Sequence, residues 1–272
     1  MATKKSPQRI EAFDLSPGRV LARKYEILSL LGAGWEGEVY HIRELATGIE
    51  RTAKLYFPHR NLKDQSAQRY AKKMHDLRHC PIVIQYSTQE VLLVKGLPVT
   101  VLISEYIEGE LLSQFIARQK AKRLSAFMAL HLLHALARGM ACVHDLGDYH
   151  GDLHSDNIIM QRYGLSFDLK LVDLFSASGS TRDNIQSDTV DLIHIFHEAL
   201  GGAKHYASHP QEIKDICCGL KRTLILKKFK TAGQLTRYLA QRPAGGSADR
   251  LAACRCLDLG QFRLSGSRYR WR

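Results

Sequence analysis

The residues best suited to chemistry lie in one segment, residues 150–157, with the sequence HGDLHSDN. Sixteen residues after Asn157, Asp173 ends the run Lys170-Leu171-Val172-Asp173. An Asp-x4-Asn pair followed by an apolar strand ending in Asp suits magnesium-dependent phosphoryl transfer. That chemistry needs one carboxylate to orient the attacking hydroxyl, and oxygen ligands to hold the metal. The segment therefore predicts phosphoryl transfer.

A second segment, residues 32–39 (GAGWEGEV), fits the pattern GxGxxGxV. It runs into the alternating residues 39–42, so we interpret it as a strand–loop–strand hairpin rather than a dinucleotide-binding turn before a helix. Glycines allow backbone N–H groups to approach phosphate oxygens without a Cβ in the way. Lys54 lies on the next predicted strand, from which its ammonium can reach phosphates. A plain glycine-rich hairpin and a surface lysine are the alternatives.

The elements that must position these residues change character near residue 109. Before it, β-branched or alternating runs predict strands at 25–31, 39–44, 51–56, 82–87, 91–94 and 99–106. Apolar residues at three- and four-residue spacing predict one helix over 67–77. After it, we expect helices at 124–146, 188–200, 211–220 and 232–239, the second of them capped by Ser187-Asp188, and a short strand at 158–160. The chain is therefore predicted to be α+β.

These motifs resemble the protein-kinase family, and in particular its bacterial serine/threonine-kinase branch. HGDLHSDN resembles the HRDLKxxN catalytic loop, and VDLF resembles the xDFG segment. The glycine-rich loop, Lys54 and residues 102–107 match the glycine loop, the phosphate-binding lysine and the hinge. Further matches follow in order at 187–202 and 229–235. The resemblance implies two lobes, the first an antiparallel sheet with one helix and the second mainly helical.

The resemblance also implies which residues bind ATP. The glycines would cover the phosphates, the lysine would hold them, and apolar side chains would sandwich the adenine. The hinge would offer backbone groups beside a gatekeeper serine. The expected residues are Gly32, Gly34, Gly37, Val39, Thr52, Lys54, Ser104, Glu105, Ile107 and Ile159.

For the reaction itself, the resemblance implies roles for five residues. Asp152 would be the catalytic base, with Lys54 completing the catalytic pair. Asn157 and Asp173 would be the Mg²⁺ ligands. Asp188 would be structural, accepting hydrogen bonds from the backbone of the catalytic loop. The implied cofactors are ATP and Mg²⁺.

One departure from the family pattern concerns the partner of Lys54. The family pairs this lysine with a glutamate on the helix of the N-terminal lobe, but no glutamate lies between residues 54 and 90. Counting back from residues 79–83 (HCPIV), the slot falls on Tyr70, and Gln68 or Asp64 is an alternative partner. A kinase-like protein without catalysis is therefore an alternative.

The other departures lie in the loops. Glu36 stands near the tip of the glycine-rich loop, where we expect its carboxylate to face solvent rather than phosphate. Gly151 replaces the arginine of HRD, which argues against control by a phosphorylated loop, and His154 stands where protein kinases carry Lys. Only 15 residues separate Asp173 from Asp188, without an APE motif, and Lys228 stands where the family has the arginine that pairs with it. We expect an unusual acceptor mode.

The composition, with 45% hydrophobic and 24% charged residues, excludes a disordered or collagen-like chain. The N-terminus lacks the apolar core of a signal peptide, and no apolar run approaches the roughly 18 residues of a membrane span. The six cysteines form no CxxC pair, so we expect reduced thiols in a cytoplasmic protein rather than disulfides or a zinc site. Part of the net charge of +12 lies in residues 241–272, where a solvated basic tail is favoured over nucleic-acid binding.

The predicted organisation is a flexible leader over residues 1–20, an N-terminal lobe over 21–108, a C-terminal lobe over 109–241 and a basic tail over 242–272. The leading hypothesis is a serine/threonine protein kinase whose acceptor, a protein or a small molecule, is unknown. The alternatives are a pseudokinase that acts as a nucleotide-binding or scaffolding module, and a small-molecule kinase, which the HGDLH spelling favours.

Overall fold

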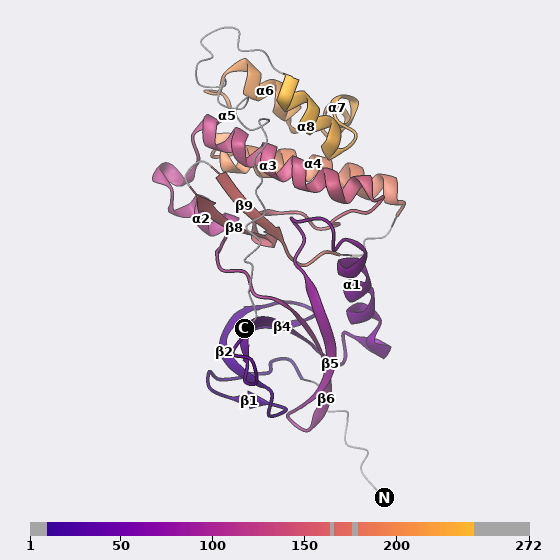
Figure 1. The fold of residues 1–272 in the computed structure, drawn as a ribbon. Helices are drawn as coiled ribbons and strands as arrows, with labels where there is room; N and C mark the ends of the chain where they lie inside the picture. Colours follow the sequence, from indigo (N-terminus) through magenta and orange to yellow (C-terminus); the bar gives the residue numbers. More distant parts are fainter. Residues whose placement is uncertain (1–9, 164–165, 176–178, 242–272) are drawn as a thin grey trace, which may run out of the picture.

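A six-stranded antiparallel sheet forms the N-terminal lobe (Figure 1). The computed structural model describes residues 10–163, 166–175 and 179–241. The strands run in the order β1-β2-β3-β4-β6-β5. Their bounds are β1 Val20–Leu21, β2 Tyr25–Ala33, β3 Gly37–Glu44, β4 Glu50–Tyr56, β5 Tyr86–Val94 and β6 Leu97–Glu105. The runs predicted at 82–87 and 91–94 belong to one strand that begins only at Tyr86, because residues 82–84 are instead buried in the core that the two lobes share.

Helix α1, Gln65–Asp76, follows the short 3-10 helix η1, Leu62–Asp64, and runs beside β5 (Figure 1). Its buried face comprises Ala67, Tyr70, Ala71, Lys73 and Met74. Four of these five residues follow the predicted apolar spacing, and the buried lysine does not. The helix therefore brings one charged side chain into the interior.

The described part of the predicted leader packs on the sheet. Ile10, Phe13 and Leu15 are buried, and the Phe13 ring stacks on Phe57 with centroids 5.2 Å apart. The Phe13 N–H donates to the buried carboxylate of Glu38 at 3.2 Å. Residues 10–15 therefore differ from the flexible leader expected over residues 1–20, because Ile10, Phe13 and Leu15 complete the core of the sheet. Residues 1–9 lie outside the described residues.

The C-terminal lobe is mainly helical, with a small sheet in the order β7-β8-β9 next to the first lobe (Figure 1). Helices α3 and α4 lie side by side, and α8 packs on α3. The elements are β7 Glu110–Leu111, α2 Leu112–Arg118, η2 Lys120–Lys122, α3 Ala126–Asp145, η3 Ser155–Asn157, β8 Ile158–Tyr163, β9 Ser166–Leu171, α4 Thr181–Ala199, α5 Ala203–Tyr206, α6 Gln211–Cys217, η4 Cys218–Leu220, α7 Arg222–Lys228 and α8 Ala232–Gln241. The two-lobed α+β fold is confirmed.

Helix α4 begins earlier than predicted. Its N-cap is Ser180, whose side chain accepts a hydrogen bond from the Asp183 N–H. The expected cap at Ser187-Asp188 is wrong, because Asp188 lies in the middle of the helix and is fully buried. Polar side chains over the first two turns hid this part of the helix from the hydrophobic pattern.

Two cysteines differ from the expectation of reduced thiols. Cys80, in the turn after α1, and Cys142, on α3, form a disulfide with Cα atoms 5.7 Å apart. The prediction is wrong for this pair, because the packing of that turn against α3 brings together residues that are 62 positions apart. Because these two cysteines are oxidised, the cysteines do not support the expected cytoplasmic location. Cys217 and Cys218 are free thiols, and Cys254 and Cys256 lie outside the described residues.

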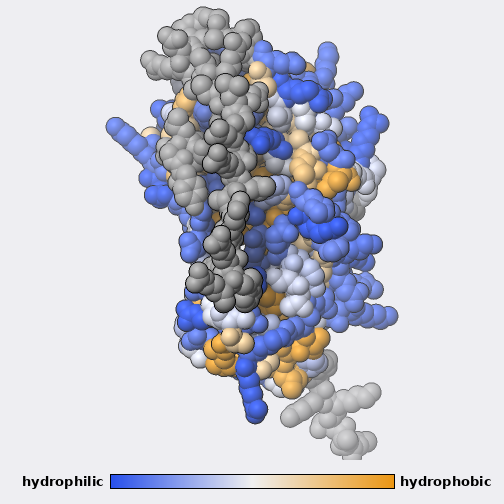
Figure 2. Space-filling view, viewed as in Figure 1, coloured by the Kyte–Doolittle hydropathy of each residue, from blue (hydrophilic) through white to orange (hydrophobic). Residues whose placement is uncertain are grey.

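The surface in Figure 2 is largely hydrophilic, in keeping with the net charge of +12. Apolar residues gather at the end of the N-terminal lobe that lies farthest from the helices (Figure 2). Among the described residues, only helix α3 is long and apolar enough to cross a membrane, and half of that apolar window is buried inside the structure. The core helix of a water-exposed domain has the same properties, so α3 is weak evidence for a membrane span.

Candidate active site

A cavity of about 330 Å³ opens between the two lobes. Its walls come from β2, β3, β4, β6 and α1 on one side and from β7, β8 and residues 172–173 on the other. The predicted residues that line it are Gly32, Val39, Thr52, Lys54, Ser104, Glu105, Ile107, Ile159 and Asp173. Gly34, Gly37, Asp152 and Asn157 are not in the wall. Most of the residues expected around a nucleotide therefore meet at one cavity.

The three glycines of the glycine-rich loop differ in their surroundings. A Cβ on Gly37 would overlap the backbone carbonyl of Leu55 on β4, whereas Gly32 and Gly34 have open space around the Cβ position. Gly37 is therefore required by the close approach of β3 to β4. Gly32 and Gly34 are the two that leave room for a ligand.

The hinge between the lobes is held by the side chain of Glu105. Its carboxylate accepts hydrogen bonds from the Gln85 N–H at 2.8 Å and from Lys170 Nζ at 3.1 Å. Ser104 is buried opposite Thr52 across the β4–β6 pair. These contacts fix the end of β6, where residues 105–107 line the cavity.

Lys54 links the lobes at the inner end of the cavity. Its Nζ lies 2.8 Å from Asp173 Oδ1 and 3.2 Å from Glu36 Oε2. Burial by itself would lower the pKa of Lys54, but the carboxylate of Asp173, with contributions from Tyr56, Tyr70 and Glu36, raises it above its usual value. The lysine is therefore a permanent cation that attracts anionic ligands.

Glu36 does not face solvent, contrary to the expectation. Its carboxylate points inward to Lys54, and the exposed residue at the tip is Trp35, with the Arg60 guanidinium 4.2 Å from its ring centroid. The expectation is wrong because the Lys54 ammonium, with no glutamate from α1 beside it, attracts the Glu36 carboxylate in addition to that of Asp173.

Tyr70 occupies the slot on α1 where the family has its glutamate. The Lys54 ammonium lies 4.9 Å from the centroid of the Tyr70 ring, and the ring is buried. The two alternative partners face elsewhere: Asp64 accepts hydrogen bonds from Asn61 and Thr100, and Gln68 is exposed. The ion pair typical of the family is therefore replaced by a cation–π contact.

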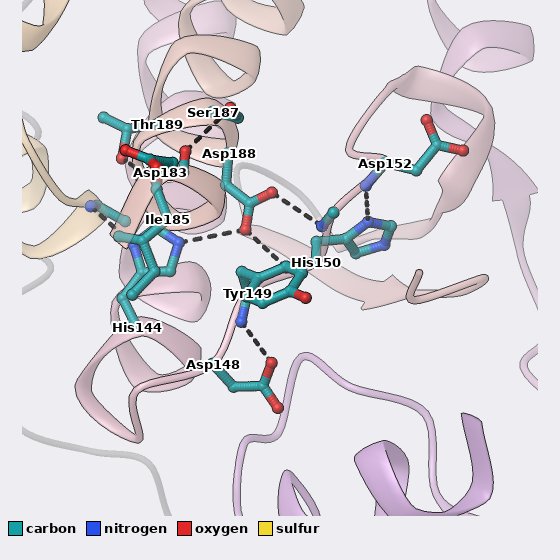
Figure 3. Close-up of polar contacts among 12 residues, drawn as sticks. His144, Asp148, Tyr149, His150, Asp152, Asp183, Ile185, Ser187, Asp188 and Thr189 are labelled. Atoms are coloured by element: carbon teal, nitrogen blue, oxygen red, sulfur yellow. Dashed lines mark hydrogen bonds and ion pairs between the residues drawn. The ribbon is translucent and has the colours of Figure 1, made fainter. Parts of the chain in front are cut away.

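The buried carboxylate of Asp188 anchors the loop His150–Asp152 (Figure 3). This carboxylate accepts hydrogen bonds from the N–H groups of His150 at 2.6 Å and Gly151 at 3.0 Å. His144 Nδ1 accepts the N–H of Ala232, so its other nitrogen, Nε2, carries the proton and faces Asp188 Oδ2 at 3.4 Å. Three donors thus surround one fully buried carboxylate, and the sequence pattern gave no indication of His144.

Asp152 lies on the far side of the same loop, with its carboxylate turned away from Asp188 (Figure 3). The Asp152 side chain is 63% exposed, and its Oδ2 lies 3.7 Å from His154 Nε2. Asn157 Nδ2 donates to the Asp152 carbonyl at 2.8 Å and contacts His154 Nε2 at 2.9 Å. The amide nitrogen of Asn157 thus faces the loop, which leaves its Oδ1 as the atom able to bind a cation.

The donor set suits Mg²⁺. Asn157 and Asp173 supply oxygen, which magnesium prefers, and no sulfur or imidazole group is needed. The Asp173 side chain is 46% exposed, so its second carboxylate oxygen is accessible beside the one that contacts Lys54.

The family described as "Protein kinase domain" matches residues 25–213. Cyclin-dependent kinase B2-2 of Arabidopsis thaliana is 28% identical over 192 residues, which are 68% of this chain and 60% of the relative. CBL-interacting serine/threonine-protein kinase 15 of the same plant is 30% identical over 172 residues, 61% of this chain and 38% of the relative. The chain thus spans at most about 60% of these relatives.

Among solved structures, a double mutant of the Mycobacterium tuberculosis PknI kinase domain superimposes with a TM-score of 0.62 at 17% identity. The match covers 82% of this chain and 97% of the solved one. At this identity the likeness concerns the fold.

Proposed function

The chain belongs to the protein kinase family, and from this premise we propose that it is an ATP- and magnesium-dependent phosphotransferase of the serine/threonine protein kinase type. The observation that carries the proposal is the 2.8 Å contact between Lys54 Nζ and Asp173 Oδ1 at the inter-lobe cavity. A lysine that binds phosphates and a carboxylate that binds their magnesium must face the same nucleotide. The contact between Lys54 and Asp173, both of which line the cavity, supports these two roles.

The cavity divides into an apolar and a polar part. Val39 and Ile159 come from opposite lobes and would enclose the adenine, with backbone groups of Glu105 and Ile107 at its edge and Ser104 behind it. Gly32 and Gly34 have open space at their Cβ positions, which favours phosphates beside the glycine-rich loop. The lining residues thus match a nucleoside triphosphate from base to phosphates.

In the proposed reaction, Asp152 accepts the proton of the acceptor hydroxyl while that oxygen bonds to the γ-phosphorus of ATP. The bond between the γ-phosphorus and the β–γ bridging oxygen breaks, and ADP leaves. Magnesium held by Asn157 Oδ1 and Asp173 would neutralise charge on the phosphates. His154 Nε2 lies beside this base, 3.7 Å from Asp152 Oδ2.

The proposal on how the phosphate acceptor docks rests on the length of the segment between Asp173 and helix α4. Helix α4 begins at Thr181, only eight residues after Asp173, so little chain is left to form a peptide-docking platform. We therefore propose an acceptor that docks differently from an ordinary peptide. The kinship with serine/threonine kinases, which include Pkn2 of Myxococcus xanthus at 28% identity, favours a protein over a small molecule.

A second candidate function is a pseudokinase that serves as a scaffold. The observation in its favour is the Glu36 carboxylate at Lys54, in the place that phosphates would take. We also propose a cytoplasmic location. The disulfide between Cys80 and Cys142 removes the argument from reduced thiols, so this proposal rests only on the supply of ATP in the cytoplasm.

The test is a calorimetric titration with ATP, with and without Mg²⁺, followed by a transfer assay with radiolabelled ATP against protein and small-molecule acceptors. Wild type should bind ATP more tightly with magnesium, and Asp173→Ala should lose that dependence. Asp152→Ala should bind like wild type and transfer nothing. Asp168→Ala, an exposed carboxylate on β9, is the matched control. Wild type that fails to bind millimolar ATP would establish the scaffold instead.

A further inference from the structure

Helix α1 contacts the segment Asp173–Phe175 at both of its ends. The Asp173 N–H donates to the Tyr70 hydroxyl at 3.2 Å, and Lys73 Nζ donates to the Phe175 carbonyl at 2.8 Å. Tyr70 and Lys73 lie three residues apart on one face of the helix, as neighbours on a helix surface do. Their exposed fractions are only 9% and 7%. One helix face thus fixes the start and the end of the segment that carries the proposed metal ligand.

We propose that Tyr70 and Lys73, here called the α1 clamp, are positioning residues that replace the missing ion pair between α1 and Lys54. The inference rests on the proposed phosphotransferase function. In it, the clamp sets the direction of the Asp173 carboxylate and the place of the Lys54 ammonium without a carboxylate on α1.

Tyr70 makes contact with both partners at once. Its hydroxyl binds the Asp173 backbone, and its ring lies 4.9 Å from Lys54 Nζ. Asp173 has a backbone φ of 54°, a left-handed conformation that is unfavourable for a residue with a Cβ. A buried partner for its N–H holds the residue in this conformation, from which the carboxylate reaches Lys54.

Lys73 extends the same arrangement to the catalytic loop. Its Nζ lies 3.3 Å from Asp148 Oδ1 and 3.8 Å from the centroid of the Tyr149 ring, directly before the segment His150–Asp152. The Phe175 N–H donates to the His150 carbonyl at 2.8 Å. The lysine therefore ties α1 to the metal-binding segment and to the loop that carries the proposed base.

Gly151 completes the arrangement from the other side. It has a φ of 90°, and a Cβ there would lie 2.6 Å from the Phe175 carbonyl oxygen, the atom that Lys73 binds. Three departures from the family pattern, namely no glutamate on α1, HGD for HRD and DLF for DFG, therefore meet at one place. They form one connected arrangement rather than separate losses.

The first test needs no nucleotide. Hydrogen exchange of the Asp173 amide should be about tenfold faster in Tyr70→Phe than in wild type, because the variant loses only the hydroxyl that accepts this N–H. The melting temperature is measured alongside, so that a local effect is separated from unfolding. Unchanged exchange at Asp173 would overturn the clamp.

The second test uses ATP with and without Mg²⁺. Tyr70→Phe should reduce the gain in affinity from magnesium about fivefold and leave magnesium-free binding unchanged, since the ring stays beside Lys54. Tyr70→Leu should weaken magnesium-free binding as well. Tyr70→Glu, which restores the family's carboxylate to the slot, should bind more tightly than Tyr70→Leu.

Lys73→Met tests the other end of the clamp, with the adjacent exposed Lys72→Met as its control. Lys73→Met should lower the turnover number at least about tenfold with little change in the dissociation constant for magnesium-free ATP. Equal effects of the two variants would overturn the role of Lys73. If wild type bound no ATP while Tyr70→Phe still sped exchange, the proposed function would fail and the clamp contacts would stand.

Discussion

Glu36 Oε2 in the glycine-rich loop lies 3.2 Å from Lys54 Nζ on β4. Under the proposed function, this carboxylate binds the ammonium that the phosphates of ATP must reach. Two anions repel each other at such a short range, so nucleotide binding requires Glu36 to move away. Both side chains are mostly buried, at 15% and 28% exposed, and salt screens their attraction only in part. Under the proposed function, the Glu36 carboxylate in the glycine-rich loop therefore competes with the nucleotide phosphates for Lys54.

Replacing Glu36 by glutamine should tighten ATP binding. The variant keeps the size of the side chain and removes its charge. The free energy of ATP binding should improve by about 1 kcal/mol, which is roughly a fivefold lower dissociation constant for ATP. Titration calorimetry measures it, with Glu44→Gln at the far end of β3 as the control. Weaker binding by Glu36→Gln would show instead that the carboxylate supports Lys54 in the way the family's helix glutamate does.

Asp188→Asn should lower the stability of the protein. The amide presents N–H groups where the buried carboxylate now accepts from His150, Gly151 and His144. Hydrogen bonds to a charged acceptor contribute roughly 1.5–3 kcal/mol each, so the free energy of unfolding should fall by at least about 2 kcal/mol. The measurement is chemical denaturation, with the neighbouring Ser187→Ala as the control. A variant as stable as wild type would contradict the anchoring role of Asp188.

The pH dependence of stability should change in Asp191→Asn. Burial, followed by the charge of Asp188, raises the pKa of Asp191 to about 7, against the lowering effect of Arg222. The native state then binds a proton that the unfolded chain, with a pKa near roughly 3.9, has lost. The contribution of Asp191 to the free energy of unfolding is fully present below about pH 4 and is lost as the pH rises to about 7. It is lost because the carboxyl of the unfolded chain ionises freely in this range, whereas burial disfavours ionisation in the native state.

The asparagine side chain in Asp191→Asn does not ionise, so the variant should not show this loss of stability as the pH rises. The variant should be more stable than wild type at pH 8 by about 2 kcal/mol, a value reduced for the part of the group that contacts water. At pH 4 the two proteins should be equally stable. Denaturation curves at both pH values measure the difference, with the exposed Asp76→Asn as control. A constant offset at all pH values would contradict the titration of Asp191.

Much of the fold followed from patterns that are local in the sequence. Alternation predicted β2, β3, β4 and most of β6, and the spacing of apolar residues predicted α1, α3 and α8. The spacing of the glycine-rich loop, Lys54 and the hinge residues indicated most of the predicted residues that line the inter-lobe cavity. These features depend on neighbours within a few residues, which a single sequence contains.

The direction of individual side chains did not follow from such patterns. Glu36 points inward because of Lys54, and Lys54 contacts Asp173, which lies 119 positions away. Lys73 was hidden in the apolar spacing of α1, since a buried lysine is explained only by distant partners, here the Asp148 carboxylate and the Phe175 carbonyl. The one available signal was a basic residue on the predicted buried face of that helix.

Gly151 offers a test that separates backbone strain from a steric clash. Gly147 and Gly151 have φ angles of 73° and 90°, both unfavourable for alanine. Around Gly147 no atom lies within 4 Å of the Cβ position, whereas at Gly151 the Phe175 carbonyl oxygen lies 2.6 Å from it. Gly147→Ala thus carries the backbone cost alone, on the order of 1 kcal/mol.

Gly151→Ala carries the same cost and must also displace the Phe175 carbonyl, which Lys73 holds in place. We expect it to be about 1–3 kcal/mol less stable than Gly147→Ala, as in other overpacked sites. It should also lower the rate of phosphoryl transfer. Asp173 lies only two residues before Phe175, so a shift at Phe175 also displaces the Asp173 carboxylate. Denaturation and turnover of both variants measure the two effects. Equal behaviour of the two alanine variants would show that the Phe175 carbonyl yields freely, and that the catalytic loop and the metal-binding segment are not packed against each other.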